Sequence, residues 1–143
     1  MINTPRLSLE DARVILSACE AKAREIGVDM DIAVTDDSGN LIAFQRMDGA
    51  RITSINISID KAWTAAAARK ATRDYWNAAQ PGSLAYGINA SNGGRFSTVP
   101  GGLPVFVEGQ IVGGVGCSSG TPDQDEVVSQ AGIDAFLDTL GRD

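Results

Sequence analysis

The sequence predicts an α+β domain in which helices pack on an antiparallel sheet made of two β-hairpins. Apolar residues recur at steps of three and four in three long segments, as they do on helices. Two other segments each place short apolar strands on either side of turn residues. The chain of 143 residues has the length of one domain. We therefore expect residues 1–143 to form a single domain with the element order α-β-β-α-α-β-β-α.

The first helix is expected to begin after Ser8 and to end near Ile26. A serine at the N-cap accepts a hydrogen bond from a first-turn amide, and Gly27 suits the left-handed position that ends a helix. The helix is predicted to bury one apolar stripe against the sheet. This stripe consists of Ala12, Ile15, Leu16, Cys19, Ala23 and Ile26.

The first hairpin follows directly. Residues Asp29–Thr35 alternate polar and apolar side chains, which is the two-residue period of a strand with one buried face. The turn residues Asp36–Asn40 separate this strand from the return strand Leu41–Arg46. These two strands are predicted to pair with each other.

The middle of the chain combines helices with a long loop. A helix is expected from about Ser54 to Arg69, and a short helix follows at Arg73–Ala79. The expected buried stripe of the longer helix consists of Ile55, Ile59, Ala62, Trp63 and Ala66. The segment Ser83–Thr98 is rich in glycine, asparagine and serine, and loops of this length in compact domains are usually functional or mobile.

The second hairpin contains an unusual number of glycines. Its strands, Leu103–Val107 and Gln110–Val115, flank the two-residue turn Glu108–Gly109. Nine of the sixteen glycines lie between Gly93 and Gly120. Because glycine weakens a strand, its presence indicates that a helix, a ligand or another chain comes close to the backbone.

The last helix is expected to begin after Thr121. Pro122 fits its first position, and Gln124 completes a capping box with Thr121 that is worth about 1 kcal/mol. The apolar residues at helical spacing in this segment are Val127, Val128, Ala131, Ala135 and Leu140.

Bulk composition excludes several classes of function. The net charge of −6 argues against nucleic acid and anionic membranes as partners, because both need basic surface. The sequence has neither a secretion signal nor 18 consecutive apolar residues, so we expect a cytoplasmic protein. Its two cysteines, Cys19 and Cys117, are expected to be buried thiols. With so few cysteines and no histidine, no metal site is predicted, and mechanisms that need a histidine base are excluded.

Motifs along nearly the whole chain resemble those of the GlcG/HbpS family, the haem-degrading-type domain also found at the C-terminus of PduO-type proteins. They are Ala33–Asp36 with Gly39–Leu41, Arg46–Ala50, Ser54, Lys61–Ala62 with Thr64–Ala65, Pro100–Pro104, Gly109, Val112–Gly114 with Gly116, and Gly120–Pro122 with Asp125. The resemblance implies a profilin-like sandwich that assembles into dimers or larger homo-oligomers. It also makes haem or another tetrapyrrole the first ligand to test.

The absence of histidine separates this chain from relatives in which a histidine is held to ligate haem. A haem iron would need another axial ligand here. The candidates are a hydroxyl group or one of Met30, Met47, Tyr75, Tyr86 and Cys117.

The candidate site is assembled from two loops and the helix between them. An arginine can clamp a carboxylate or a haem propionate with two hydrogen bonds, and paired glycine amides can form an anion-binding nest. The positive charge for a small anionic ligand would come from Arg46, Arg51, Lys61 and Arg95. The predicted ligand-binding residues are Arg46, Met47, Asp48, Gly49, Ser54, Lys61, Arg95, Phe96, Pro100, Gly101 and Gly102.

Plainer interpretations stay open beside these, namely an Arg46–Asp48 surface pair and an exposed Lys61. Three classes of function follow. The first is a homo-oligomer that binds a small anionic ligand such as haem. The second is a cofactor-independent enzyme for a small organic acid or aromatic catabolite, in which Lys61 or Asp48 moves the proton. The third is an accessory or assembly subunit whose glycine-rich hairpin packs against a partner.

Overall fold

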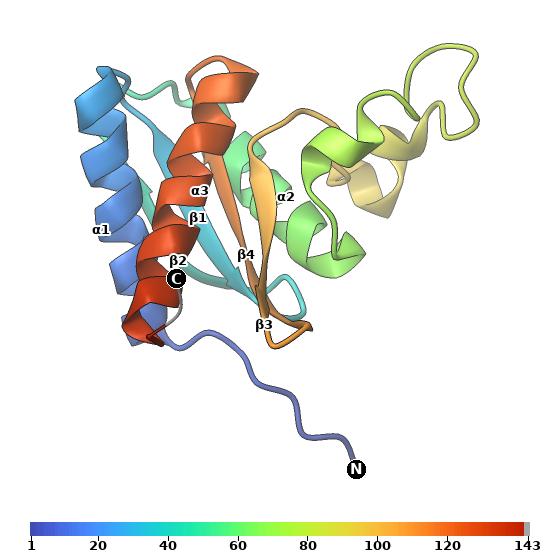
Figure 1. The fold of residues 1–143 in the computed structure, drawn as a ribbon. Coiled ribbons are helices and arrows are strands. Elements are labelled where there is room, and N and C mark those ends of the chain that lie inside the picture. Colours follow the sequence, from blue (N-terminus) through green and yellow to red (C-terminus); the bar gives the residue numbers. More distant parts are fainter. Residues whose placement is uncertain (142–143) are drawn as a thin grey trace.

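The computed structural model describes residues 1–141 and has the predicted α+β fold, arranged in three layers (Figure 1). Helices α1 and α3 lie side by side on one face of the sheet, and α2 covers the other face. The antiparallel sheet has the order β2-β1-β4-β3, and the two predicted hairpins are joined because β1 pairs with β4. The elements are α1 (Leu9–Ile26), β1 (Asp31–Asp36), β2 (Leu41–Arg46), α2 (Thr53–Ala68), the 3₁₀ turns η1 (Thr72–Tyr75), η2 (Ile88–Ala90) and η3 (Asn92–Gly94), β3 (Gly102–Val107), β4 (Gln110–Ser118) and α3 (Pro122–Thr139).

Helices α1 and α3 begin with capping boxes, made by Ser8 with Asp11 and by Thr121 with Gln124. Gly27 ends α1 in the left-handed conformation, as expected. These two helices bury large apolar side chains against the sheet. The core includes Ile15, Leu16, Cys19, Met30, Ile32, Val34, Val115, Cys117, Val128, Ile133 and Phe136. Both cysteines are free and buried, as predicted.

The opposite face of the sheet is lined by glycines. A Cβ atom on Gly116 would lie 2.1 Å from the carbonyl oxygen of Ser58, and one on Gly114 would lie 2.3 Å from that of Ala62. No side chain fits at such distances, so only glycine allows α2 to approach the sheet this closely. The glycines of the second hairpin therefore admit a helix, one of the three neighbours that the sequence left open.

The predicted buried faces of two helices need correction. In α2, Ile55, Ile59 and Trp63 are only half-buried. The buried residues of α2 are Ser54, Ser58, Lys61, Ala62, Thr64, Ala65 and Ala66. Val127 of α3 and Leu140, which directly follows α3, are exposed. The buried residues of α3 are Asp125, Val128, Ser129, Gly132, Ile133 and Phe136. Helix α2 buries alanines because the glycines of β4 let its backbone come close to the sheet. Helix α3 buries Asp125 and Ser129 because they bond to Gly120 and Gly101 in loops at the end of the sheet.

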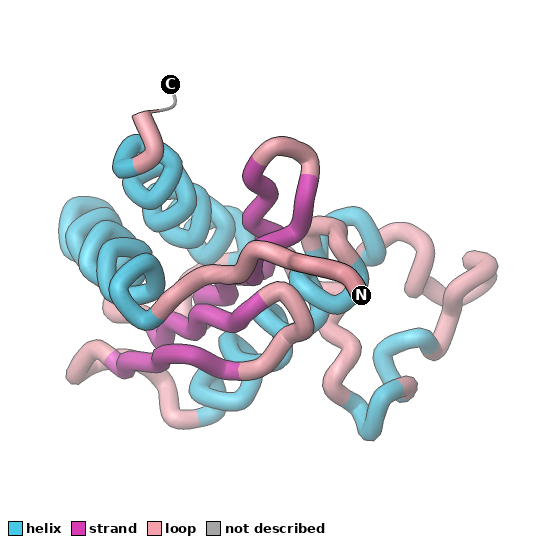
Figure 2. Tube along the Cα trace, turned by 90° about the horizontal axis from the view of Figure 1, so that it is seen from below, coloured by secondary structure: helices cyan, strands magenta, loops and turns pink. Residues whose placement is uncertain are grey.

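The predicted helix Arg73–Ala79 is replaced by the 3₁₀ turn Thr72–Tyr75. Too few residues precede Pro81 for helix propagation to outweigh nucleation. Residues 76–98, called the arm below, then leave the body of the protein as a chain of turns (Figure 1). Figure 2, seen from below, shows the N-terminal stretch crossing the end of the sheet on its way to α1. None of the helices in residues 1–141 is long and apolar enough to cross a membrane.

Candidate ligand-binding site

Several predicted site residues lie at one end of the sheet. The strand register places Arg46 of β2 and Ser118 of β4 on either side of Asp31 in β1. Strand β3 begins at this same end with Gly102, which pairs with β4 two residues before Ser118. The loops that carry the predicted site therefore leave the sheet from this end.

A buried ion pair joins α2 to α3 behind these loops. The ammonium nitrogen of Lys61, whose residue is only 1% exposed, lies 2.9 Å from Asp125 Oδ2 and 3.0 Å from the carbonyl oxygen of Cys117, and it donates to both. The other carboxylate oxygen of Asp125 accepts the N–H of Gly120 at 2.9 Å. Burial raises the pKa of Asp125 above its ordinary value, although the neighbouring Lys61 acts to lower it. This lysine is therefore neither exposed nor open to a ligand in this conformation.

The loop Pro100–Gly102 lies directly on the ion pair. A Cβ atom on Gly101 would lie 2.8 Å from Lys61 Nζ, and the backbone at Gly101 has a φ of +132°. A glycine is needed here for both reasons. The carbonyl oxygen of Gly101 accepts a hydrogen bond of 2.7 Å from the hydroxyl of Ser129. The structure therefore brings together three of the predicted site residues, Lys61, Gly101 and Gly102.

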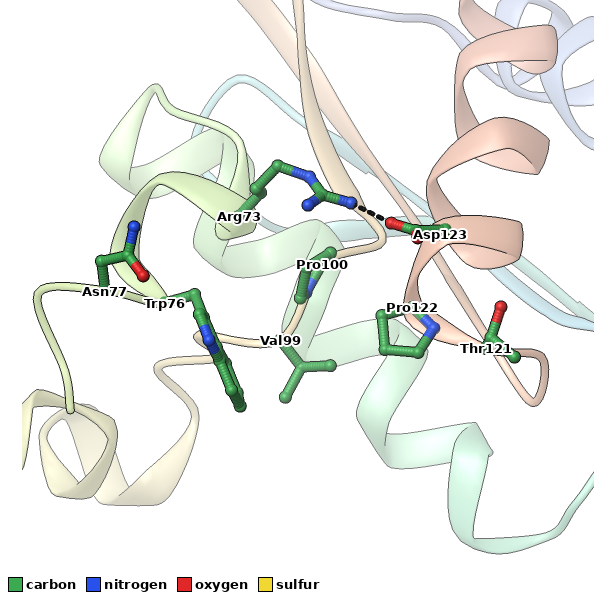
Figure 3. A pocket seen from close by; sticks show the side chains of 8 residues that line it. All are labelled: Arg73, Trp76, Asn77, Val99, Pro100, Thr121, Pro122 and Asp123. Atoms are coloured by element: carbon green, nitrogen blue, oxygen red, sulfur yellow. Dashed lines mark hydrogen bonds and ion pairs between the residues drawn. The ribbon is translucent and has the colours of Figure 1, made fainter.

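A pocket of about 540 Å³ opens beside this loop (Figure 3). Its volume falls within the range of small-molecule sites, about 300–1,000 Å³. The lining residues come from η1 and the residues after it, from the loop before β3, and from the start of α3. They are Arg73, Trp76, Asn77, Val99, Pro100, Thr121, Pro122 and Asp123. The tryptophan, the valine and the two prolines give the pocket apolar walls.

Arg73 is the basic residue of this pocket, and it is already paired. Its guanidinium contacts Asp123 across the pocket (Figure 3) and also Glu126, whose carboxylate lies 3.1 Å from Nε. These two carboxylates raise the pKa of Arg73 above its ordinary value. An anionic ligand would therefore have to compete with Asp123 for this guanidinium.

The Arg46–Ala50 loop opens into a different hollow, of about 290 Å³, where Arg46, Met47 and Asp48 form part of the wall. Met47 is buried at its back, and its sulfur accepts a hydrogen bond from the Met30 N–H at 3.3 Å. Asp48 is exposed, whereas Lys61 is buried on the α2 side. In the described part of the chain, the two residues expected to move a proton thus share no cavity.

Arg95 and Phe96 line a third hollow, of about 280 Å³, between the arm and α2. The guanidinium of Arg95 stacks over the ring of Trp63, 4.6 Å from its centroid, and contacts Asp60 at 3.4 Å. Phe96 meets Tyr75 edge to face, with their ring centroids 4.8 Å apart. Both predicted ligand contacts are thus engaged within the protein.

Gly49 and Ser54 also have partners within the protein. The Gly49 N–H donates to the carboxylate of Asp29 at 2.6 Å, and the buried Ser54 donates its N–H to the carbonyl oxygen of Arg51 at 3.1 Å. The structure therefore distributes the four basic residues of the predicted site over separate places. Arg46 and Arg95 line different hollows, Lys61 is buried, and Arg51 donates to the carbonyl oxygen of Ser119.

A family profile described as haem degrading protein HbpS-like matches residues 7–134. The chain belongs to the HbpS-like family. It is 41% identical over 130 residues to an uncharacterized 15.0 kDa protein in the dhaT-dhaS intergenic region of Citrobacter freundii, an alignment that covers 91% of this chain and 92% of the relative.

Solved structures agree with this assignment. Klebsiella pneumoniae protein ORFY superposes with a TM-score of 0.94 at 37% identity, over 96% of this chain and 94% of that one. PduOC, solved as a complex with heme, superposes with a TM-score of 0.87 at 31% identity, over 91% of this chain and 94% of that one. The family predicted from the sequence motifs is confirmed.

None of the five residues expected as haem ligands in this HbpS-like chain lines the pocket beside the Pro100–Gly102 loop. Met30, Met47 and Cys117 are at most 6% exposed in the core. Tyr86 is 68% exposed on the arm, and Tyr75 directly precedes a residue of the large pocket. Within residues 1–141, no three His, Cys, Asp or Glu side chains lie where they could hold a metal ion together.

Asp31 is an unusual residue that the sequence analysis missed. Both of its carboxylate oxygens are buried, and neither has a hydrogen-bond partner among the described residues. Burial raises the pKa of Asp31 to about 6, although Arg46 on the neighbouring strand acts to lower it. The alternating pattern of this strand indicated a solvated face for Asp31. The pattern could not indicate that β1 is a central strand of the sheet and that α2 covers the face on which Asp31 lies.

Proposed function

We propose that this chain binds haem or a similar flat tetrapyrrole in the pocket beside the Pro100–Gly102 loop. The observation that carries the proposal is the arrangement of Trp76 and Pro122 on facing walls, with Arg73 at one end of the pocket (Figure 3). The heme complex of PduOC supports it, because that relative shares this fold over nearly the whole chain.

The residues present fit such a ligand in two respects. The apolar walls suit a porphyrin ring, and Trp76 offers a flat surface for stacking. Arg73 would hold a haem propionate if the propionate displaced the Asp123 carboxylate from the guanidinium. Bound haem would supply an iron centre that can bind small molecules or exchange an electron. Of the expected iron ligands we propose Tyr75, which directly precedes Trp76 of the pocket wall and would have to leave its contact with Phe96 to reach the ligand.

We also propose that the protein forms homo-oligomers. Besides Met1 and Ile2 at the N-terminus, three large hydrophobic side chains of the described residues are strongly exposed, namely Ile52 at 73%, Leu84 at 108% and Tyr86 at 68%. Two of them lie on the arm, which leaves the body of the protein. Such exposure is typical of a surface that another chain covers. Light scattering after size exclusion tests this directly, because a single 14.9 kDa mass would contradict it.

Titration with hemin tests the proposed ligand. The Soret band should shift on binding, and Trp76→Ala should weaken the affinity about tenfold, since lost stacking and burial are worth about 1.4 kcal/mol. Phe106→Ala is the matched control, because Phe106 is as exposed as Trp76 (42% and 47%) but lines a different hollow. Equal affinities of the two variants would contradict the placement of the site.

The same titration separates the other two classes of function. Absence of any Soret shift, together with turnover of a small organic acid that Lys61→Ala abolishes, would favour a cofactor-independent enzyme. Absence of both, with co-purification of another protein, would favour an accessory subunit. Neither class has a specific contact in its favour, because Lys61 is buried in an ion pair and Asp48 lines a separate hollow.

A further inference from the structure

We infer that Lys61 and Asp125 are positioning residues, whose buried ion pair holds two walls of the pocket without touching the ligand. The inference rests on the proposed function only where hemin affinity is measured. The mobility of the pocket walls can be measured in the protein without ligand. The side chains of Lys61 and Asp125 are 1% and 3% exposed, and the pocket lies in front of them, beyond the loop that contacts the ammonium.

Asp125 holds the wall that α3 contributes. Its Oδ1 accepts the N–H of Gly120, which immediately precedes Thr121 and Pro122 of the pocket. A Cβ atom on Gly120 would lie 2.8 Å from the methyl carbon of Met30, so the chain turns here in a confined space. The carboxylate thus fixes the point at which the backbone enters the helix.

Lys61 holds the wall that precedes β3. Its ammonium fills the space that a side chain on Gly101 would need, and it donates to the carbonyl oxygen of Cys117. The Cys117 N–H in turn donates to the carbonyl oxygen of Gly101 at 3.2 Å. The lysine therefore sets the spacing between the end of β4 and Pro100, which lines the pocket.

Thr72 connects the wall formed by η1 and the residues after it to the loop before β3. Its hydroxyl donates to the carbonyl oxygen of Val99 at 2.7 Å and accepts the N–H of Gly102 at 3.1 Å. Thr72 begins η1, and Arg73 and Trp76 follow it in the pocket wall. A displacement of the loop before β3 would therefore reach all three walls.

Stability alone does not account for an ion pair at this place. Removing two charges from water costs about as much as their attraction returns, so an apolar pair of similar volume often serves a fold equally well. An apolar pair cannot bond to the Gly120 N–H or the Cys117 carbonyl oxygen, as Asp125 and Lys61 do. We therefore expect the ion pair to affect the pocket more than the stability of the protein.

The test is the double variant Lys61→Met with Asp125→Leu, which removes both charges and leaves none uncompensated. Amide hydrogen exchange in the free protein should become about tenfold faster at Gly120, which loses its hydrogen bond to Asp125. Exchange should also become faster at Gly102, which keeps its bond to Thr72 but lies in the loop that loses its contact with the Lys61 ammonium. Hemin affinity should fall by about the same factor. The thermal midpoint should fall only slightly, because the bonds lost by Gly120 and Cys117 are offset in part by no longer burying two charges. Ile15→Val is the control, because it loosens the core on the α1 and α3 face without touching the pocket.

Wild-type exchange rates at Gly102 and Gly120 in the double variant would overturn the inference, whether or not hemin binds. A wild-type protein that does not bind hemin would refute the proposed function, and the exchange rates would still decide the positioning role. If the double variant does not fold, Asp125→Asn replaces it, since it keeps the size of the side chain and an oxygen that can accept the Gly120 N–H, and removes only the negative charge that holds Lys61. Exchange at Gly102 should then rise about threefold, and an unchanged rate would overturn the inference.

Discussion

The two faces of the sheet are built from different kinds of residue. On the α1 and α3 face, side chains such as Ile15, Val34 and Phe136 are buried in an apolar core. Fully burying such a side chain contributes about 1.5–3 kcal/mol. On the α2 face, glycines meet alanines, and the charged residues Asp31 and Lys61 are buried there. This difference indicates that the α1 and α3 face contributes most of the apolar burial that stabilises the fold. The α2 face contributes less, and instead brings the helix backbone and buried charges close to the site.

The largest expected effect is a loss of stability that leaves the pocket intact. Phe136→Ala should lower the free energy of unfolding by about 3–5 kcal/mol, because it leaves a cavity in the apolar face. Urea denaturation measures this change, and hemin titration of the folded fraction should give the wild-type affinity. A folded Phe136→Ala protein that has lost hemin binding would contradict the claim that this face stabilises the fold without shaping the pocket.

The second effect depends on pH and belongs to the α2 face. The pKa of Asp31 is raised to about 6 in the folded protein from its ordinary value of 3.8. Folding therefore takes up a proton in this interval, so the free energy of unfolding falls as pH rises from about 4 to 6 and stays low above it. The difference between the two pKa values corresponds to about 3 kcal/mol. Asp31→Asn should remove this loss, stabilising the protein at pH 7 while changing little at pH 4.

Chemical denaturation at several pH values measures the Asp31 effect as the difference between variant and wild type. Asp138→Asn is the control, because it removes an exposed carboxylate from the outer face of α3. A variant that is less stable than the wild type at pH 7 would show that the Asp31 carboxylate has a stabilising partner.

The smallest effect compares two caps of the same kind. Ser8→Ala and Thr121→Ala each remove the side-chain half of a capping box, and each should lower the free energy of unfolding by about 1 kcal/mol. Only Thr121 lines the pocket, so only Thr121→Ala should weaken hemin binding. An equal effect of both variants on hemin affinity would mean that the cap acts through stability alone.

Much of the fold could be predicted from local chemistry. Ser8, Thr121 and Gly27 are placed by rules that depend on a few neighbouring residues, and the structure has all three where they were expected. Glycines in the second hairpin indicated a close neighbour, and α2 is that neighbour. These features depend on backbone geometry within one or two turns of the chain.

The site could be predicted only in part, because its shape depends on packing between distant segments. Lys61 was expected near Gly101 and Gly102, but its burial depends on Asp125, which lies 64 residues away. The signal that could have indicated Asp125 is its helical spacing with Val128, Ser129, Gly132, Ile133 and Phe136, the buried residues of α3. Arg73 and Trp76 were missed because Arg73 lies in a 3₁₀ turn and Trp76 directly follows it, and such a short turn leaves no periodic pattern in the sequence.

The most direct test of the central claim is a map of amide chemical shifts on titration with zinc protoporphyrin, a diamagnetic tetrapyrrole. We expect the changes to centre on Arg73–Asn77, Val99–Gly102 and Gly120–Asp123. Changes centred on Arg46–Asp48, or on Arg95 and Phe96, would place the ligand in another hollow and contradict the claim.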